Sequence, residues 1–67
     1  MIRINLLKDS MQKKAITMDD LANKLQISKA SLYYRFNGKV LFKINELQEI
    51  KDYLDLDFAT FKEIFFE

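Results

Sequence analysis

The sequence predicts an all-α fold, a compact bundle of about five short helices. Two features support this: the 67 residues contain no proline and one glycine, and apolar residues recur at helical spacing along the chain. A β fold with many turns would need more of both turn-forming residues. Because a chain of this length can bury only one core, residues 1–67 are expected to form a single domain.

The first three helices are predicted over roughly residues 2–14, 18–25 and 29–36. Leu7 and Met11, four residues apart, lie on the apolar stripe of the first helix. The second and third helices are short and are separated by only a few residues. Two such helices cannot lie antiparallel side by side, so they must cross steeply, as in a helix-turn-helix.

Capping residues mark the limits of these two crossing helices. Thr17 and Ser28 stand where N-caps are needed, and Gly38, after Asn37, can take the positive φ that ends the third helix. The residues expected to lock the crossing pair together are Leu21, Ala22, Leu25, Ile27, Leu32 and Phe36.

An extended segment and two further helices are expected after the glycine. Between Lys39 and Ile44 there is no helical period, and the run Val40–Phe42 is expected to place its side chains on the core. Asn45 is expected to cap the fourth helix, with Gln48 completing a capping box. Asp57 is expected to cap the fifth.

The net charge of +1 conceals an uneven distribution along the chain. Residues 1–43 carry nine basic and three acidic side chains (+6), whereas residues 44–67 carry two basic and seven acidic ones (−5). This division favours a polyanion-binding surface on the N-terminal part. The alternative is a chance distribution over solvated faces, and the C-terminal carboxylates are expected to be mostly solvated.

Composition argues against several other classes of function. Without histidine or cysteine the chain lacks the usual general base and the commonest metal ligands. A single glycine argues against a glycine-rich phosphate loop. The longest apolar run, Ile64–Phe66, is far too short to span a membrane. We therefore expect no enzyme activity, no metal, no cofactor and no membrane contact.

Several segments resemble a known family. Thr17 to Ser28, which reads TMDDLANKLQIS, resembles the helix-turn-helix of Cro/CI-type (XRE-like) phage repressors. The segments similar to small Cro-like proteins of Gram-positive phages are Ser31–Lys39 followed by Phe42, Leu47 and Ile50, and the ending Glu63–Phe66. The resemblance spans about Leu6 to Phe66. It implies a lambda-repressor-like fold and a sequence-specific transcriptional repressor of a phage or prophage switch. Such a protein binds a double-stranded DNA operator in the cytoplasm of a bacterial host.

The same resemblance assigns roles to residues of the third helix and its flanks. The recognition helix, about Lys29 to Phe36, is expected to lie in the major groove. The residues at base-reading positions are Lys29, Ala30, Tyr33 and Tyr34. Lys29 can donate to guanine and Ala30 can touch a thymine methyl. The residues expected at phosphates are Ser28, Asn37, Lys39 and Lys43. Alternatives are a solvated Lys29 and half-buried packing of Tyr33.

Three positions depart from the family pattern. Met18 replaces the usual glutamine, which removes one side-chain phosphate contact. Gln26 replaces the usual turn glycine and must adopt a left-handed conformation, at a cost of roughly 1–2 kcal/mol. Arg35 stands where many members have an aliphatic residue, and we expect its stem to pack while its charged head reaches solvent.

The last segment is rich in phenylalanine for so small a core. Ile64, Phe65 and Phe66 are expected to expose an apolar patch of the kind that marks an interface. Homodimerisation is the first expected use, because two-fold partners read half-sites about 34 Å apart. One alternative is a modulator or antirepressor that binds a partner CI-type repressor protein. Another is a monomer with every aromatic side chain in the core.

Overall fold

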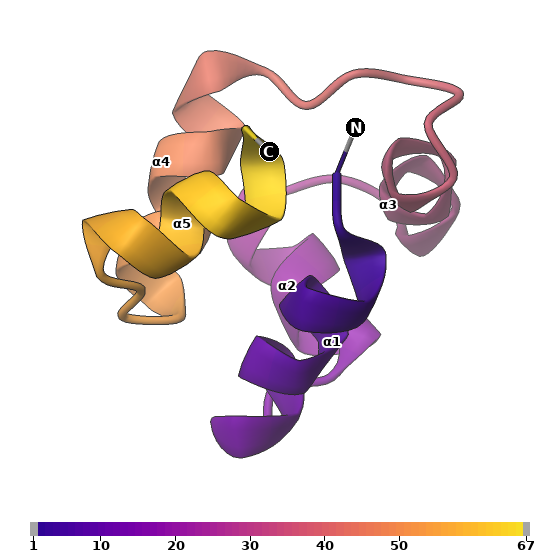
Figure 1. The fold of residues 1–67 in the computed structure, drawn as a ribbon. Helices are drawn as coiled ribbons and strands as arrows, with labels where there is room; N and C mark the ends of the chain where they lie inside the picture. Colours follow the sequence, from indigo (N-terminus) through magenta and orange to yellow (C-terminus); the bar gives the residue numbers. More distant parts are fainter. Residues whose placement is uncertain (1, 67) are drawn as a thin grey trace.

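Five α-helices follow one another in the computed structural model, which describes residues 2–66 (Figure 1). They are α1 (Ile4–Lys13), α2 (Met18–Leu25), α3 (Lys29–Phe36), α4 (Ile44–Tyr53) and α5 (Phe58–Phe65). In Figure 1, α3 stands on one side of the molecule and α4 and α5 on the other, and the segment after α3 crosses between them. The prediction of an all-α fold is confirmed. No helix within residues 2–66 is long and apolar enough to cross a membrane.

Three of the predicted N-caps are confirmed by hydrogen bonds. Thr17 Oγ1 accepts from the N–H of Asp20 at 3.1 Å, and Asp20 accepts from the N–H of Thr17 at 3.0 Å, which completes a capping box. Ser28 Oγ accepts from the N–H of Ser31 at 3.0 Å. Asp57 accepts from the third N–H of α5 at 2.7 Å. Each bond satisfies a backbone donor that the helix itself leaves unpaired.

Four helices are followed by a residue with positive φ. Gln26 takes the predicted left-handed conformation (φ 57°, ψ 41°), and Gly38 has φ 80°. Ala15 and Asp55 do the same after α1 and α4, with φ of 56° and 52°. After Gln26, the N–H of Ile27 donates to the Ala22 carbonyl at 3.1 Å, a bond that closes a helix end of this kind. The chain therefore turns sharply and brings α3 across α2.

The core is formed where these helices meet. All but one of the residues expected to lock α2 and α3 together are buried, and the remaining one, Ile27, is partly buried against the core. The confirmed core residues of this pair are Leu21, Ala22, Leu25, Leu32 and Phe36. α2 packs against α3 and α4, while α1 packs against α5. The recognition helix expected from the sequence is thus held by apolar contacts on its inner face.

The start of α4 differs from the prediction. Asn45 is not the cap: the helix begins at Ile44, and the N–H of the preceding Lys43 donates to Glu46 Oε1 at 2.9 Å. Gln48 instead bonds within α4, from Nε2 to Asp52 Oδ1 at 3.5 Å. The cause is the contact between Glu46 and Arg35 of α3, which holds the Glu46 carboxylate beside the N–H of Lys43.

The extended segment before α4 places only one of its three expected side chains on the core. Leu41 is 84% exposed and Val40 is 41% exposed, so the expectation was wrong for both. Phe42 does pack inward, with its ring centroid 6.3 Å from that of Phe36 and 5.9 Å from that of Phe65. One large ring fills the space between α3 and α5, and the segment runs over the surface on either side of it.

The expected exposed patch at the chain's end is reduced to one residue. Ile64 is 0% exposed and Phe65 is 7% exposed, so both belong to the core and their expected exposure was wrong. The N-terminal segment draws α5 inward, because the N–H of Arg3 donates to the Ile64 carbonyl at 2.8 Å. Phe66 remains 61% exposed, and Phe58 is also exposed, so not every aromatic side chain is in the core either.

Candidate nucleic-acid interface

The outer face of α3 carries all four residues expected to read bases. Lys29, Ala30, Tyr33 and Tyr34 are exposed, the two tyrosines at 44% and 49%. Leu32 and Phe36 of this helix point to the core instead. Each ring is thus about half covered by the protein, as the half-buried alternative for Tyr33 has it, and its other half is accessible to a partner lying along the helix.

Lys29 is paired with a carboxylate of the preceding helix. Its Nζ lies 3.4 Å from Oδ1 of Asp19, and both side chains are more than half exposed. This contact joins the first residue of α3 to the first turn of α2. A surface pair of this kind contributes about 0–1 kcal/mol, so the lysine can exchange Asp19 for a base or a phosphate.

The residues expected at phosphates flank α3 at both ends. Ser28, Asn37, Lys39 and Lys43 are all exposed. At the N-terminal end, the hydroxyl of Ser28 accepts from the N–H of Ser31 and also donates to its Oγ at 3.0 Å. At the other end, Asn37 is the C-cap of α3.

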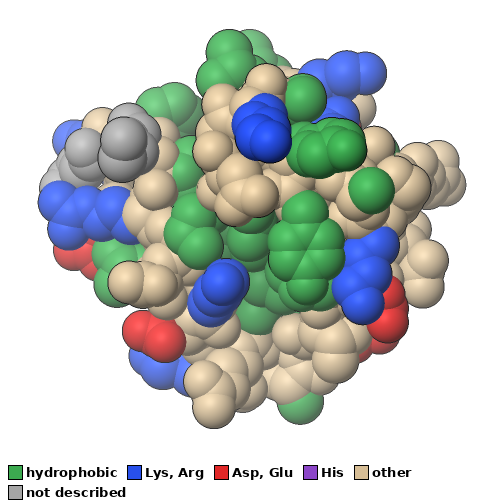
Figure 2. Space-filling view, turned by 90° about the vertical axis from the view of Figure 1, so that its right-hand side faces the viewer, with side chains coloured by type: hydrophobic (Ala, Val, Ile, Leu, Met, Phe, Trp, Pro, Cys, Tyr) green, Lys and Arg blue, Asp and Glu red, His purple; other side chains and the backbone are tan. Residues whose placement is uncertain are grey.

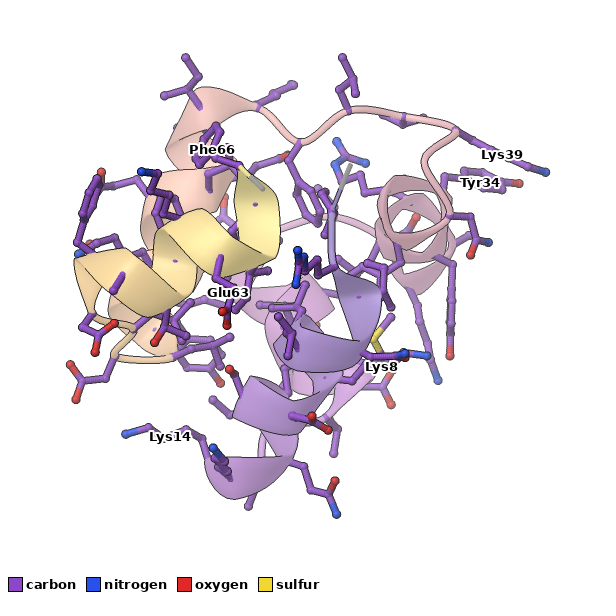
Figure 3. The ribbon with its side chains drawn as sticks, viewed as in Figure 1. Lys8, Lys14, Tyr34, Lys39, Glu63 and Phe66 are labelled. Carbon is purple, nitrogen blue, oxygen red and sulfur yellow. The ribbon has the colours of Figure 1, made fainter. Side chains whose placement is uncertain are left out.

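Lys39 and Tyr34 form a unit at the C-terminal end of α3. The Lys39 ammonium lies 5.9 Å from the centroid of the Tyr34 ring, and the Lys39 N–H donates to the Tyr34 carbonyl at 2.9 Å. Figure 3 shows the two side chains next to each other at the edge of the molecule. One residue expected at a base and one expected at a phosphate are therefore adjacent on the same surface.

The side of the molecule that carries α3 displays basic side chains. Figure 2 shows Lys and Arg side chains spread over this side among hydrophobic ones, while acidic side chains lie toward the margins. Lys8 of α1 also points toward this side in Figure 3. No individual role for Lys8 could be predicted from the sequence, because its position in the chain does not reveal that α1 turns this residue toward α3.

Arg35 contradicts its expected position. It is 8% exposed, and its head does not reach solvent, because Glu46 of α4 holds it. Arg35 Nε donates to Glu46 Oε1 at 2.9 Å and Nη2 donates to Oε2 at 3.2 Å, while Nη1 donates to the Ser31 carbonyl at 3.1 Å. Glu46, at 5% exposed, is accordingly an exception to the expected solvation of the C-terminal carboxylates.

The environment of Glu46 favours its ionised form. Burial by itself raises the pKa of this carboxyl, but the hydrogen bond from Arg35 and that from the Lys43 N–H lower it, as do the charges of both side chains. The net result is a Glu46 pKa below the usual glutamate range. The pair is therefore charged at neutral pH. A charged residue on the inner face of α3 was the one sequence signal that such a partner was needed.

The comparisons with known proteins bear on the same helix-turn-helix that the fold shows. Among residues 2–66 no group of histidine, cysteine, aspartate or glutamate side chains is arranged to hold a metal ion. Comparison with curated proteins and with solved structures gave no match. The family model of the Cro/C1-type HTH DNA-binding domain matches residues 6–67, which is nearly the whole chain. The chain therefore belongs to the Cro/C1-type helix-turn-helix family, whose members are DNA-binding domains of transcription regulators.

Proposed function

We propose that this chain is a Cro-like repressor of a phage or prophage genetic switch, acting on a DNA operator in the cytoplasm of a bacterial host. The observation that carries the proposal is the exposed face of α3, which presents Lys29, Ala30, Tyr33 and Tyr34 together. A helix presented in this way fits the major groove, where its N-terminal residues reach base edges. The chain's excess of basic residues in positions 1–43 suits a polyanion.

The proposed contacts divide into two kinds. Lys29 donates to guanine O6 and N7, Ala30 touches a thymine methyl, and the tyrosines contact methyl groups, sugars or phosphates. Ser28, Asn37, Lys39 and Lys43 bind phosphates at the two ends of α3. The first kind confers sequence preference, and the second supplies affinity and fixes the position of α3 in the groove.

We also propose that two copies bind together, because a two-fold pair reads two half-sites of an operator. Of the three interface residues expected from the sequence, Phe66 is accessible for this role. Leu41 and Ile44, at 84% and 85% exposed, are further large apolar side chains that a partner can cover. Sedimentation of the wild type and Phe66→Ser tests this step: a wild-type dimer that the change converts to monomer supports it. A wild-type monomer at all concentrations, alone and on DNA, contradicts it.

A selection experiment tests the main proposal. The wild-type protein is mixed with a pool of duplexes randomised over about 30 base pairs, and bound DNA is recovered and sequenced. A two-fold symmetric motif with half-sites about 34 Å apart is expected. Recovery of no motif, together with a lack of duplex binding at moderate salt, contradicts a repressor. The exposed apolar residues then favour the alternative, a modulator or antirepressor that binds a partner CI-type repressor protein.

A further inference from the structure

We infer that Arg35 and Glu46 are positioning residues for DNA binding. Their ion pair holds the segment 37–43 in the conformation that meets the phosphates, an inference that rests on the function proposed above. Neither residue touches DNA in this account, since they are 8% and 5% exposed. They act through Asn37, Lys39 and Lys43, which belong to the segment between them.

The pair joins both ends of this segment. Arg35 lies in the last turn of α3, two residues before Asn37, and Glu46 lies in the first turn of α4, three residues after Lys43. Glu46 Oε1 accepts from Arg35 Nε and from the Lys43 N–H, each at 2.9 Å. Because one oxygen accepts both bonds, the end of α3 and the end of the segment are fixed relative to each other.

The rest of the segment has few other attachments among the described residues. Its first residues bond back to α3, with the N–H groups of Lys39 and Val40 donating to the Tyr34 carbonyl at 2.9 and 3.3 Å. Phe42 packs between Phe36 and Phe65. Beyond Phe42, the N–H of Lys43 donates to the Glu46 carboxylate at 2.9 Å, and the Lys43 carbonyl accepts from the N–H of Leu47 at 3.0 Å. Losing the carboxylate therefore frees the N–H of Lys43, while its carbonyl stays bonded to α4.

A role in positioning differs from a role in overall stability. Replacing a buried ion pair by apolar residues of similar volume often leaves stability unchanged or raises it, because desolvation offsets the attraction between the charges. The hydrogen bonds of the pair act differently from its charges. Two parallel N–H···O bonds fix the relative orientation of the two side chains, and apolar contacts do not. An apolar replacement of both residues can therefore keep the fold and lose the alignment of the segment.

The test uses the charge-neutral double variant Arg35→Met/Glu46→Leu. Its affinity for a 20-base-pair duplex of random sequence is measured at several salt concentrations, with a melting curve and amide exchange at Lys43. We expect a folded protein with faster exchange at Lys43, an affinity about fivefold to tenfold lower at low salt, and a salt slope smaller by about one unit. A matched control is Lys14→Gln/Asp55→Asn, which removes an exposed pair 3.8 Å apart without changing net charge. Lys14 lies far from Lys39 in Figure 3, and this control should bind as the wild type does.

The outcomes are distinguishable. A wild type that binds duplex and a folded double variant with the same affinity and salt slope overturn the inference but leave the proposed function standing. A wild type that binds no duplex overturns both. If the double variant does not fold, Arg35→Lys replaces it, because lysine keeps the charge but cannot form the forked bonds. A smaller loss in the same direction supports the inference, and wild-type binding by Arg35→Lys overturns it.

Discussion

Lys29 Nζ lies 3.4 Å from Asp19 Oδ1, so the first residue of the recognition helix is tied to the first turn of the helix before it. Both side chains remain largely exposed, which keeps the contact weak and exchangeable. The lysine expected to read a base therefore has a competing partner on its own protein. If Lys29 reads a base as proposed, DNA replaces that carboxylate on binding, and the competition can be measured.

Asp19→Asn is expected to strengthen DNA binding by about threefold, because it frees Lys29 and removes a negative charge beside the groove. Affinity for a selected operator duplex at fixed salt is the measurement. Asp52→Asn, in α4, makes the same change of charge in the acidic part of the chain. Equal strengthening by the two variants would show that net charge, and not release of Lys29, is responsible.

Lys29→Ala is expected to lose discrimination at one base-pair position, by about 1–3 kcal/mol. A hydrogen-bonding side chain distinguishes bases at the position it faces, so the loss should be local. Affinities for a panel of single-base operator variants provide the test. If the variant weakens equally on every member of the panel, Lys29 contacts a phosphate.

Leu32→Ala is expected to destabilise the domain by roughly 2–5 kcal/mol, because it opens a cavity at a residue that is 0% exposed. Leu41→Ala makes the same chemical change at a residue that is 84% exposed and should change the free energy of unfolding by less than about 0.5 kcal/mol. Denaturant unfolding measures both. Similar stabilities for the two variants would place Leu32 outside the core and contradict the register of α2 and α3.

Features set by neighbouring residues were predictable from the sequence. The caps at Thr17, Ser28 and Asp57 each depend on a side chain and an N–H three residues away, so the pattern that predicts them is local. The left-handed Gln26 followed from the family resemblance, which has a turn glycine at this position. The inner face of the crossing pair followed from helical periodicity.

The errors concern contacts between distant segments. Asn45 is an adequate cap in isolation, but the helix starts earlier because Arg35, eleven residues before Glu46, holds the carboxylate that Lys43 needs. The apolar end of the chain was ambiguous for the same reason. Ile64 becomes buried when the N-terminal segment docks against α5, and no local pattern specifies that docking.

The stability contributed by Glu46 should depend on pH. Its pKa is lowered in the folded protein, so the unfolded chain binds its proton more readily, and the contribution is present above the unfolded value of about 4.3 and lost as pH falls through the folded value. Glu46→Gln should lower the free energy of unfolding at pH 7 by roughly 1.5–3 kcal/mol. The difference from the wild type should shrink below about pH 4. Urea unfolding at several pH values is the measurement, and a difference that stays constant across this range would contradict the assigned ion pair.

The dependence of DNA affinity on salt, measured for the wild type and for Lys39→Ala/Lys43→Ala, tests the central claim most directly. If these lysines bind phosphates, the double variant binds more weakly at low salt, and its slope of log affinity against log salt is smaller by roughly two units. Lys51→Ala/Lys62→Ala makes the same change of charge in α4 and α5 and should keep the wild-type slope. Negligible duplex affinity of the wild type at moderate salt, or equal slopes for the two double variants, would contradict the proposed DNA-binding surface.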